Sequence, residues 1–188
     1  MIVSLERLKK YPLLFDILVL IGALSLVGVS AFLTLYIPLT PIPLSFQTHV
    51  LLFCAVLLGS LRTTICSLLL LGLALCKVPV LASGAVGVGG LMGLTGGYIV
   101  GYVLAGFVVG LIAEYGERTL FKDSLAMLLG NLIVYLLGFA WLTHFIDPRL
   151  AFLKGIAPFV LGDCLKLIIF VKLLQKLPLG RYTAREKL

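Results

Sequence analysis

Residues 13–37 read LLFDILVLIGALSLVGVSAFLTLYI, a long apolar run in which Asp16 is the one charged side chain. A helix needs about 20 mostly apolar residues to cross a hydrocarbon core of about 30 Å. The run follows a basic N-terminal stretch, but it is too long for the short apolar region of a cleavable signal peptide. It therefore predicts a first membrane helix.

Five further apolar segments of similar length follow, at 44–61, 64–82, 96–113, 124–146 and 155–176. Backbone polar groups in lipid must be satisfied within the segment, which favours helices, and the alternating pattern of a membrane barrel is absent. The chain is 61% hydrophobic and 12% charged, whereas a soluble domain is about half apolar and a quarter charged. We predict an all-α membrane protein, a single bundle of six transmembrane helices formed by residues 1–188.

The basic residues predict how the bundle is oriented. If the N-terminus is cytoplasmic, the outer connections hold only Arg149 and Lys154. The cytoplasmic parts then hold Arg7, Lys9, Lys10, Arg62, Arg118, Lys122, Lys172, Lys176, Arg181, Arg185 and Lys187. This bias predicts that both termini are cytoplasmic. It also explains the net charge of +7 by topology, without a nucleic-acid partner.

The three outer connections differ in composition. Residues 38–48, PLTPIPLSFQT, are predicted to be extended, because Pro41 and Pro43 disfavour a helix. Residues 82–97, ASGAVGVGGLMGLTGG, are predicted to be a glycine-rich outer loop, and residues 143–155 a polar connection. The first two segments are uncharged and could fold over, or into, the helix bundle.

An acid and a base interrupt the last apolar segment, PFVLGDCLKLIIFVK (158–172). A charge at membrane depth costs about 2.5–3.5 kcal/mol, and residues three apart share one face of a helix. Asp163 and Lys166 therefore either pair to fix helix packing or form the polar floor of a ligand site open to the outside. With a helix from residue 155, they would lie roughly 12–17 Å from its outer end.

Other polar side chains lie near the predicted helix ends. Lys77 either extends toward the membrane surface or meets a ligand. Gln47 and Thr48 lie at a helix entrance, where they either cap the helix or form hydrogen bonds with neighbouring residues. Asn131 is placed near the cytoplasmic interface. Trp141, near the outer end, is either an aromatic-belt residue or a pocket wall.

The stretch GVGGLMGLTGGYIVGYVLAGFVVG (87–110) carries small residues every four positions, at 89, 93, 97, 101 and 105. From Gly96 onward this spacing predicts close helix packing. Before Gly96 the glycines are too dense for a helix, so their main-chain N–H groups could line a site with Thr95 and Tyr98 at its entrance. The stretch is not a dinucleotide fingerprint, because Met92 occupies a required glycine position.

Nothing in the sequence predicts an enzyme, a cofactor or a metal. It contains no nucleophile elbow, zinc-protease motif or phosphate-binding loop. Cys54, Cys66, Cys76 and Cys164 lack metal-ligand spacing and are predicted to be small buried hydrophobes.

Three motifs together resemble the BioY family, the biotin-binding S components of energy-coupling factor (ECF) transporters. They are PIPLSFQT, VPVLASGAVGVGGLMGLTGGYIVGY and GIAPFVLGDCLK. The resemblance implies high-affinity binding and uptake of biotin at the bacterial cytoplasmic membrane. It also implies an ECF transmembrane coupling subunit and two ATP-binding subunits as partners. The alternatives are an S component for another vitamin, or a small structural or assembly protein of the membrane.

The resemblance also implies a site near the outer surface. In the family, the residues at Asp163 and Lys166 contact the ureido head of biotin. The carboxylate of biotin is predicted to meet main-chain N–H groups near Thr95–Gly97, or Lys77. The predicted substrate-binding residues are Asp163, Lys166, Ser83, Thr95, Gly96, Gly97, Tyr98, Gln47, Lys77 and Trp141. Leu94, where the family has proline, and Lys77, in a normally neutral stretch, depart from the family pattern.

Overall fold

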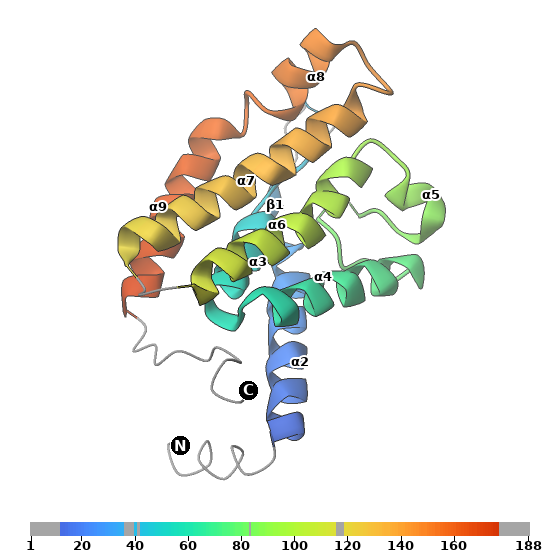
Figure 1. Cartoon of the computed structure of the whole chain (residues 1–188). Coiled ribbons are helices and arrows are strands. Elements are labelled where there is room, and N and C mark those ends of the chain that lie inside the picture. Colours follow the sequence, from blue (N-terminus) through green and yellow to red (C-terminus); the bar gives the residue numbers. More distant parts are fainter. Residues whose placement is uncertain (1–11, 36–39, 41, 83, 116–118, 177–188) are drawn as a thin grey trace.

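The computed structural model describes residues 12–35, 40, 42–82, 84–115 and 119–176 of the chain, and these residues are mostly helical (Figure 1). These described residues form six long helices: α2 (Pro12–Ser30), α3 (Gln47–Leu58), α4 (Ser60–Leu75), α6 (Gly96–Glu114), α7 (Leu120–Leu142) and α9 (Val160–Lys176). The same residues include two short helices in the connections, α5 (Gly87–Leu91) and α8 (Pro148–Gly155). Strands β1 (Thr34–Leu35) and β2 (Leu44–Ser45) pair antiparallel, with Thr34 opposite Ser45.

Helix α6 packs against α3, α4 and α7, and small residues let these neighbours approach closely. A Cβ on Gly101 would lie 3.0 Å from the Cα of Val134 on α7. A Cβ on Gly110 would meet the backbone of Gly59 and Ser60 at the start of α4. The predicted role of the small residues after Gly96 in helix packing is confirmed.

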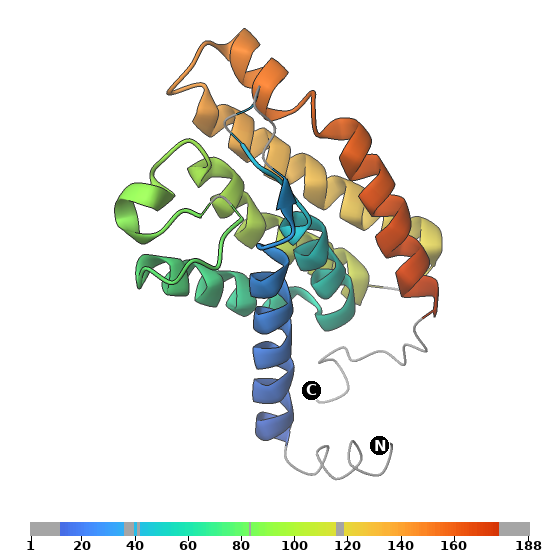
Figure 2. The ribbon, with the colours of Figure 1, turned by 180° about the vertical axis from the view of Figure 1, so that it is seen from behind.

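Helices α7 and α2 lie on opposite faces of the molecule. Figure 1 views the face formed by α7, and Figure 2 views the face crossed by α2 and β1. Helix α2 packs on α3 and α4, and only 22% of the apolar stretch from Leu13 to Ser30 is buried inside the protein. Helices α2, α6 and α7 are long and apolar enough to cross a membrane.

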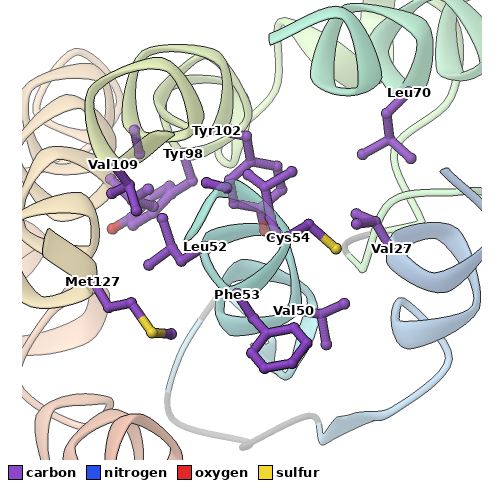
Figure 3. Packing of buried hydrophobic residues seen from close by; sticks show 14 of the residues in the cluster. Val27, Val50, Leu52, Phe53, Cys54, Leu70, Tyr98, Tyr102, Val109 and Met127 are labelled. Atoms are coloured by element: carbon purple, nitrogen blue, oxygen red, sulfur yellow. The ribbon is translucent and has the colours of Figure 1, made fainter. Parts of the chain in front are cut away.

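The core forms where α3, α6 and α7 meet (Figure 3). Leu52 on α3, Val109 on α6 and Met127 on α7 are all fully buried and lie close together. Cys54 and Cys66 are buried as predicted, but Cys76 and Cys164 are exposed. The prediction that all four cysteines are buried was therefore wrong for two of them.

The structure places several helix ends differently from the hydropathy pattern. The first helix ends at Ser30, not at residue 37, because the chain turns there and then pairs as β1 with β2. The last helix begins at Val160, not at residue 155. Asp163 and Lys166 are therefore only about 5 Å and about 9 Å along the axis from the start of α9, closer than predicted.

Two connections contain short helices that the sequence analysis missed. The segment 82–97 includes α5, so it is only partly a loop. The segment 143–155 includes α8, where the side chain of Asp147 accepts a hydrogen bond from Arg149 N at 2.9 Å and Pro148 occupies the first turn. Asp or Asn before a proline-initiated helix is a common N-terminal signal. The cytoplasmic placement of both termini stays a prediction.

Candidate functional site

A cavity lies between the β2 segment, the helix bundle and the start of α9. It encloses about 580 Å³ of empty space, part of it open to solvent. Its apolar walls include Ile42, Pro43, Leu44, Leu81, Ala82, Ile99, Val134 and Phe159. Its polar lining comprises Ser45, Thr48, Thr95, Tyr98, Tyr102, Asn131, Tyr135 and Asp163. Both outer segments predicted to fold over or into the bundle contribute to these walls.

Asp163 anchors the polar end of the cavity. It lies in the first turn of α9, where the helix dipole favours a negative charge. Its Oδ1 accepts a hydrogen bond from Lys166 Nζ at 2.8 Å, and its Oδ2 accepts from the hydroxyl of Tyr135 and from Asn131 Nδ2 at 3.4 Å. These bonds compensate for burying a carboxylate that is only 8% exposed.

The ammonium of Lys166 ties this cluster to the extended segment over the cavity. Besides Asp163, it donates to the main-chain carbonyl of Ser45 at 2.8 Å. It also lies 5.3 Å from the ring centroid of Phe46, within range of a cation–π interaction. Lys166 is not among the described residues that line the cavity, so its charge acts at the site through Asp163 and Ser45.

Tyr98 forms part of the wall where α6 meets the connection before α9. Its hydroxyl donates to the carbonyl of Gly155 at 3.0 Å. Its ring lies directly against Gly138 on α7, where a Cβ would overlap the ring. The position of this wall therefore depends on a glycine that does not itself line the cavity.

The chain matches the model of the BioY family over residues 7–180. It is 35% identical over 147 residues to the "Biotin transporter BioY" of Thermotoga maritima, covering 77% of this chain and 85% of that protein. It is 29% identical over 162 residues to the "Probable biotin transporter BioY" of Pyrococcus horikoshii, covering 86% of this chain and 94% of the relative. The chain belongs to the BioY family.

A solved structure agrees with this BioY assignment. It is the S component for biotin from an ECF-type ABC transporter, and it superposes with a TM-score of 0.78 at 25% identity. The match covers 94% of this chain and 95% of that one. The all-helical membrane architecture predicted from the sequence is therefore the BioY fold.

The structure brings three of the ten predicted site residues to the cavity wall, namely Asp163, Thr95 and Tyr98. Lys166 contacts Asp163 directly. Ser83 lies outside the described residues. The other five are not among the described residues that line the cavity, namely Gln47, Lys77, Gly96, Gly97 and Trp141.

Gln47 is fully buried, and its amide holds the chain that forms one wall. Its Nε2 donates to the carbonyls of Val80 at 2.7 Å and Val27 at 3.2 Å. Its Oε1 accepts from the main-chain N–H of Ala82 at 2.9 Å. Gln47 thus fixes the backbone around Leu81 and Ala82, and the structure gives it a positioning role in place of a direct ligand contact.

Gly96, Gly97 and Trp141 form a packing contact between α6 and α7. A Cβ on Gly97 would overlap Trp141 and the backbone of α7. The indole N–H of Trp141 donates to the carbonyl of Gly93 at 2.9 Å. Lys77 follows α4 with a φ of 67° and is exposed. Gly96, Gly97 and Trp141 therefore support the fold around the site in this structure.

Asn131 and Tyr135 were not among the predicted site residues, yet both line the polar end of the cavity. The placement of Asn131 near the cytoplasmic interface was wrong, because α7 begins at Leu120 and Asn131 lies at its middle, 9% exposed. Thr119, whose side chain accepts from Lys122 N at 3.2 Å, is the N-cap signal that marks the true start. Two polar residues four apart in an apolar helix also indicate a face turned into the bundle.

The arrangement suits a ligand with a polar head and an apolar body. Asp163 and Asn131 offer hydrogen-bond acceptors at one end, and aliphatic and aromatic walls cover the rest. In the described part of the chain, no group of His, Cys, Asp and Glu side chains could hold a metal ion.

Proposed function

We propose that this protein binds biotin in the cavity beside Asp163 and serves as the substrate-specific subunit of an ECF transporter. The observation that carries the proposal is a buried, triply hydrogen-bonded carboxylate at the end of an apolar cavity, in a chain of the BioY family. Relatives named as biotin transporters and a solved biotin S component support it.

Biotin matches the cavity chemically. Its ureido ring has two N–H donors and one carbonyl, and its thioether ring and side chain are apolar. Asp163 would accept an N–H of the ureido ring, because a carboxylate offers several lone pairs. The aliphatic side chain would lie along Ile42, Leu81 and Phe159. The carboxylate of biotin would then lie toward Thr95, which lines the cavity, and not toward the exposed Lys77.

Uptake would require partners. The sequence has no phosphate-binding loop, so ATP hydrolysis would belong to two ATP-binding subunits joined through an ECF transmembrane coupling subunit. The protein acts as a transport subunit and not as an enzyme. We place residues 1–188 as a single multi-pass unit in the bacterial cytoplasmic membrane, with both termini cytoplasmic.

Equilibrium binding of labelled biotin to the purified protein in detergent tests the proposal. Wild type is expected to bind, and Asp163→Asn and Lys166→Ala are expected to bind at least tenfold more weakly, as loss of a charge-assisted hydrogen bond implies. Unlabelled thiamine and riboflavin serve as competitors. Displacement of biotin by either at similar concentration would favour an S component for another vitamin, and no binding of biotin would reject the proposal.

A further inference from the structure

The side-chain carbonyl oxygen of Asn131 accepts no hydrogen bond from the described residues. Asn131, the only asparagine in the sequence, lies at the middle of α7 and lines the cavity. Its Nδ2 donates to Asp163, but its buried Oδ1 has no hydrogen-bond partner among the described residues. A buried polar group without a partner is unfavourable, so this oxygen is poised to accept a hydrogen bond from a bound molecule.

The chemistry of the neighbours fixes which way the amide points. Asp163 forms an ion pair with Lys166 at 2.8 Å, and a carboxylate can only accept hydrogen bonds. The amide NH₂ must therefore face Asp163, because the reverse orientation would place the carbonyl oxygen against the carboxylate. Tyr135, one turn along α7, donates to the same Oδ2 of Asp163. The Oδ1 of Asn131 is left as a buried acceptor on a residue that lines the cavity.

We propose that Asn131 Oδ1 accepts one N–H of the ligand's ureido ring and so makes Asn131 a specificity-determining residue of the site. This inference rests on the proposed biotin binding. A ureido ring presents two N–H donors, and two neighbouring residues that line the cavity carry acceptors, the carboxylate of Asp163 and the amide oxygen of Asn131. One N–H meets each acceptor, so the site recognises a cyclic urea by both of its donors.

A site of this design rejects ligands that lack a donor, because its own acceptor is then left unpaired. The two N-methyl biotins, each with one ureido N–H replaced by N–CH₃, are the appropriate probes. One of them removes the N–H that meets Asn131, and the other removes the N–H that meets Asp163. Wild type is expected to bind both at least tenfold more weakly than biotin.

The test compares wild type, Asn131→Ala and Leu132→Ala with biotin and both N-methyl biotins by equilibrium titration. Leu132 is the neighbouring position on α7, 46% exposed, and its variant should behave as wild type. Asn131→Ala should bind biotin about 10–100-fold more weakly. It should nevertheless bind one of the N-methyl biotins as well as wild type does or better, because the truncated side chain leaves room for the methyl group.

Selective loss of discrimination against one N-methyl biotin supports the proposal. Equal weakening of all three ligands, or unchanged biotin affinity in Asn131→Ala, overturns it while leaving the proposed function intact. If Asn131→Ala does not elute as a single species, Asn131→Ser is titrated with the same ligands and judged by the same criteria. Wild type that binds no biotin at all would reject both the proposed function and this inference.

Discussion

The ammonium of Lys166 on α9 donates a 2.8 Å hydrogen bond to the carbonyl of Ser45 on β2, 121 residues away along the chain. The same ammonium binds Asp163 at 2.8 Å. One cation therefore joins the carboxylate at the polar end of the cavity to the extended segment that forms its wall.

Replacing Lys166 with Met should weaken biotin binding even though Lys166 does not line the cavity. The variant keeps much of the side-chain volume, but it frees Ser45 and leaves the Asp163 carboxylate buried without its cation. We expect the dissociation constant to rise about 10–100-fold, with a faster dissociation rate. Labelled-biotin dissociation measures this, and an unchanged rate would show that the Ser45 contact is not needed.

The ion pair itself should be dispensable for folding but not for binding. Asp163→Leu or Lys166→Leu alone leaves one buried charge unpaired, which should lower the free energy of unfolding by about 3–5 kcal/mol. The double variant removes both charges and should be more stable than either single variant, although Tyr135, Asn131 and Ser45 lose these partners. Thermal unfolding in detergent gives the stability order, and biotin titration of the double variant should show no binding. Retained binding would mean that the pair only fixes helix packing.

Lengths of apolar segments were sufficient to predict the helical membrane fold, because lipid imposes that length and excludes other backbone structures. They could not locate the first helix end at Ser30, since residues 31–35 remain mostly apolar while their backbone turns and pairs with β2. Asn131 was misplaced for the same reason. The apolar pattern predicted a helix from residue 124, four residues after the observed start of α7 at Leu120, whereas the N-cap at Thr119 marks the observed start.

Residue type predicted Asp163 as a site residue, because an ionised side chain in an apolar helix requires partners. Residue type could not show whether the side chain of Gln47 bonds to the backbone or to a ligand, since a polar side chain at a helix entrance can do either. Only the tertiary arrangement shows that the Gln47 amide is fully engaged with Val27, Val80 and Ala82.

Gln47→Leu should speed the release of biotin. The variant removes three hydrogen bonds and leaves the carbonyl of Val80 and the N–H of Ala82 without this partner, so the wall at Leu81 and Ala82 loosens. We expect the dissociation rate to rise about tenfold or more, with a smaller change in the association rate. Gln175→Leu, at an exposed position in the last turn of α9, is the matched control and should leave both rates unchanged. If both variants release biotin at the wild-type rate, the positioning role of Gln47 is wrong.

Gly138→Ala should impair the site without touching a ligand. The added Cβ would overlap the ring of Tyr98, which lines the cavity and is held by its bond to Gly155, so the ring cannot yield without moving the wall. Overpacking of this kind costs about 1–3 kcal/mol, and we expect lower thermal stability together with weaker biotin binding. Gly72→Ala on α4 is the matched control, because a Cβ there meets nothing within 4 Å. It should raise stability by up to about 1 kcal/mol, since alanine favours a helix over glycine, and leave binding unchanged. Equal stability and affinity in the two variants would show that Tyr98 adapts to the methyl group, and that the wall does not depend on Gly138.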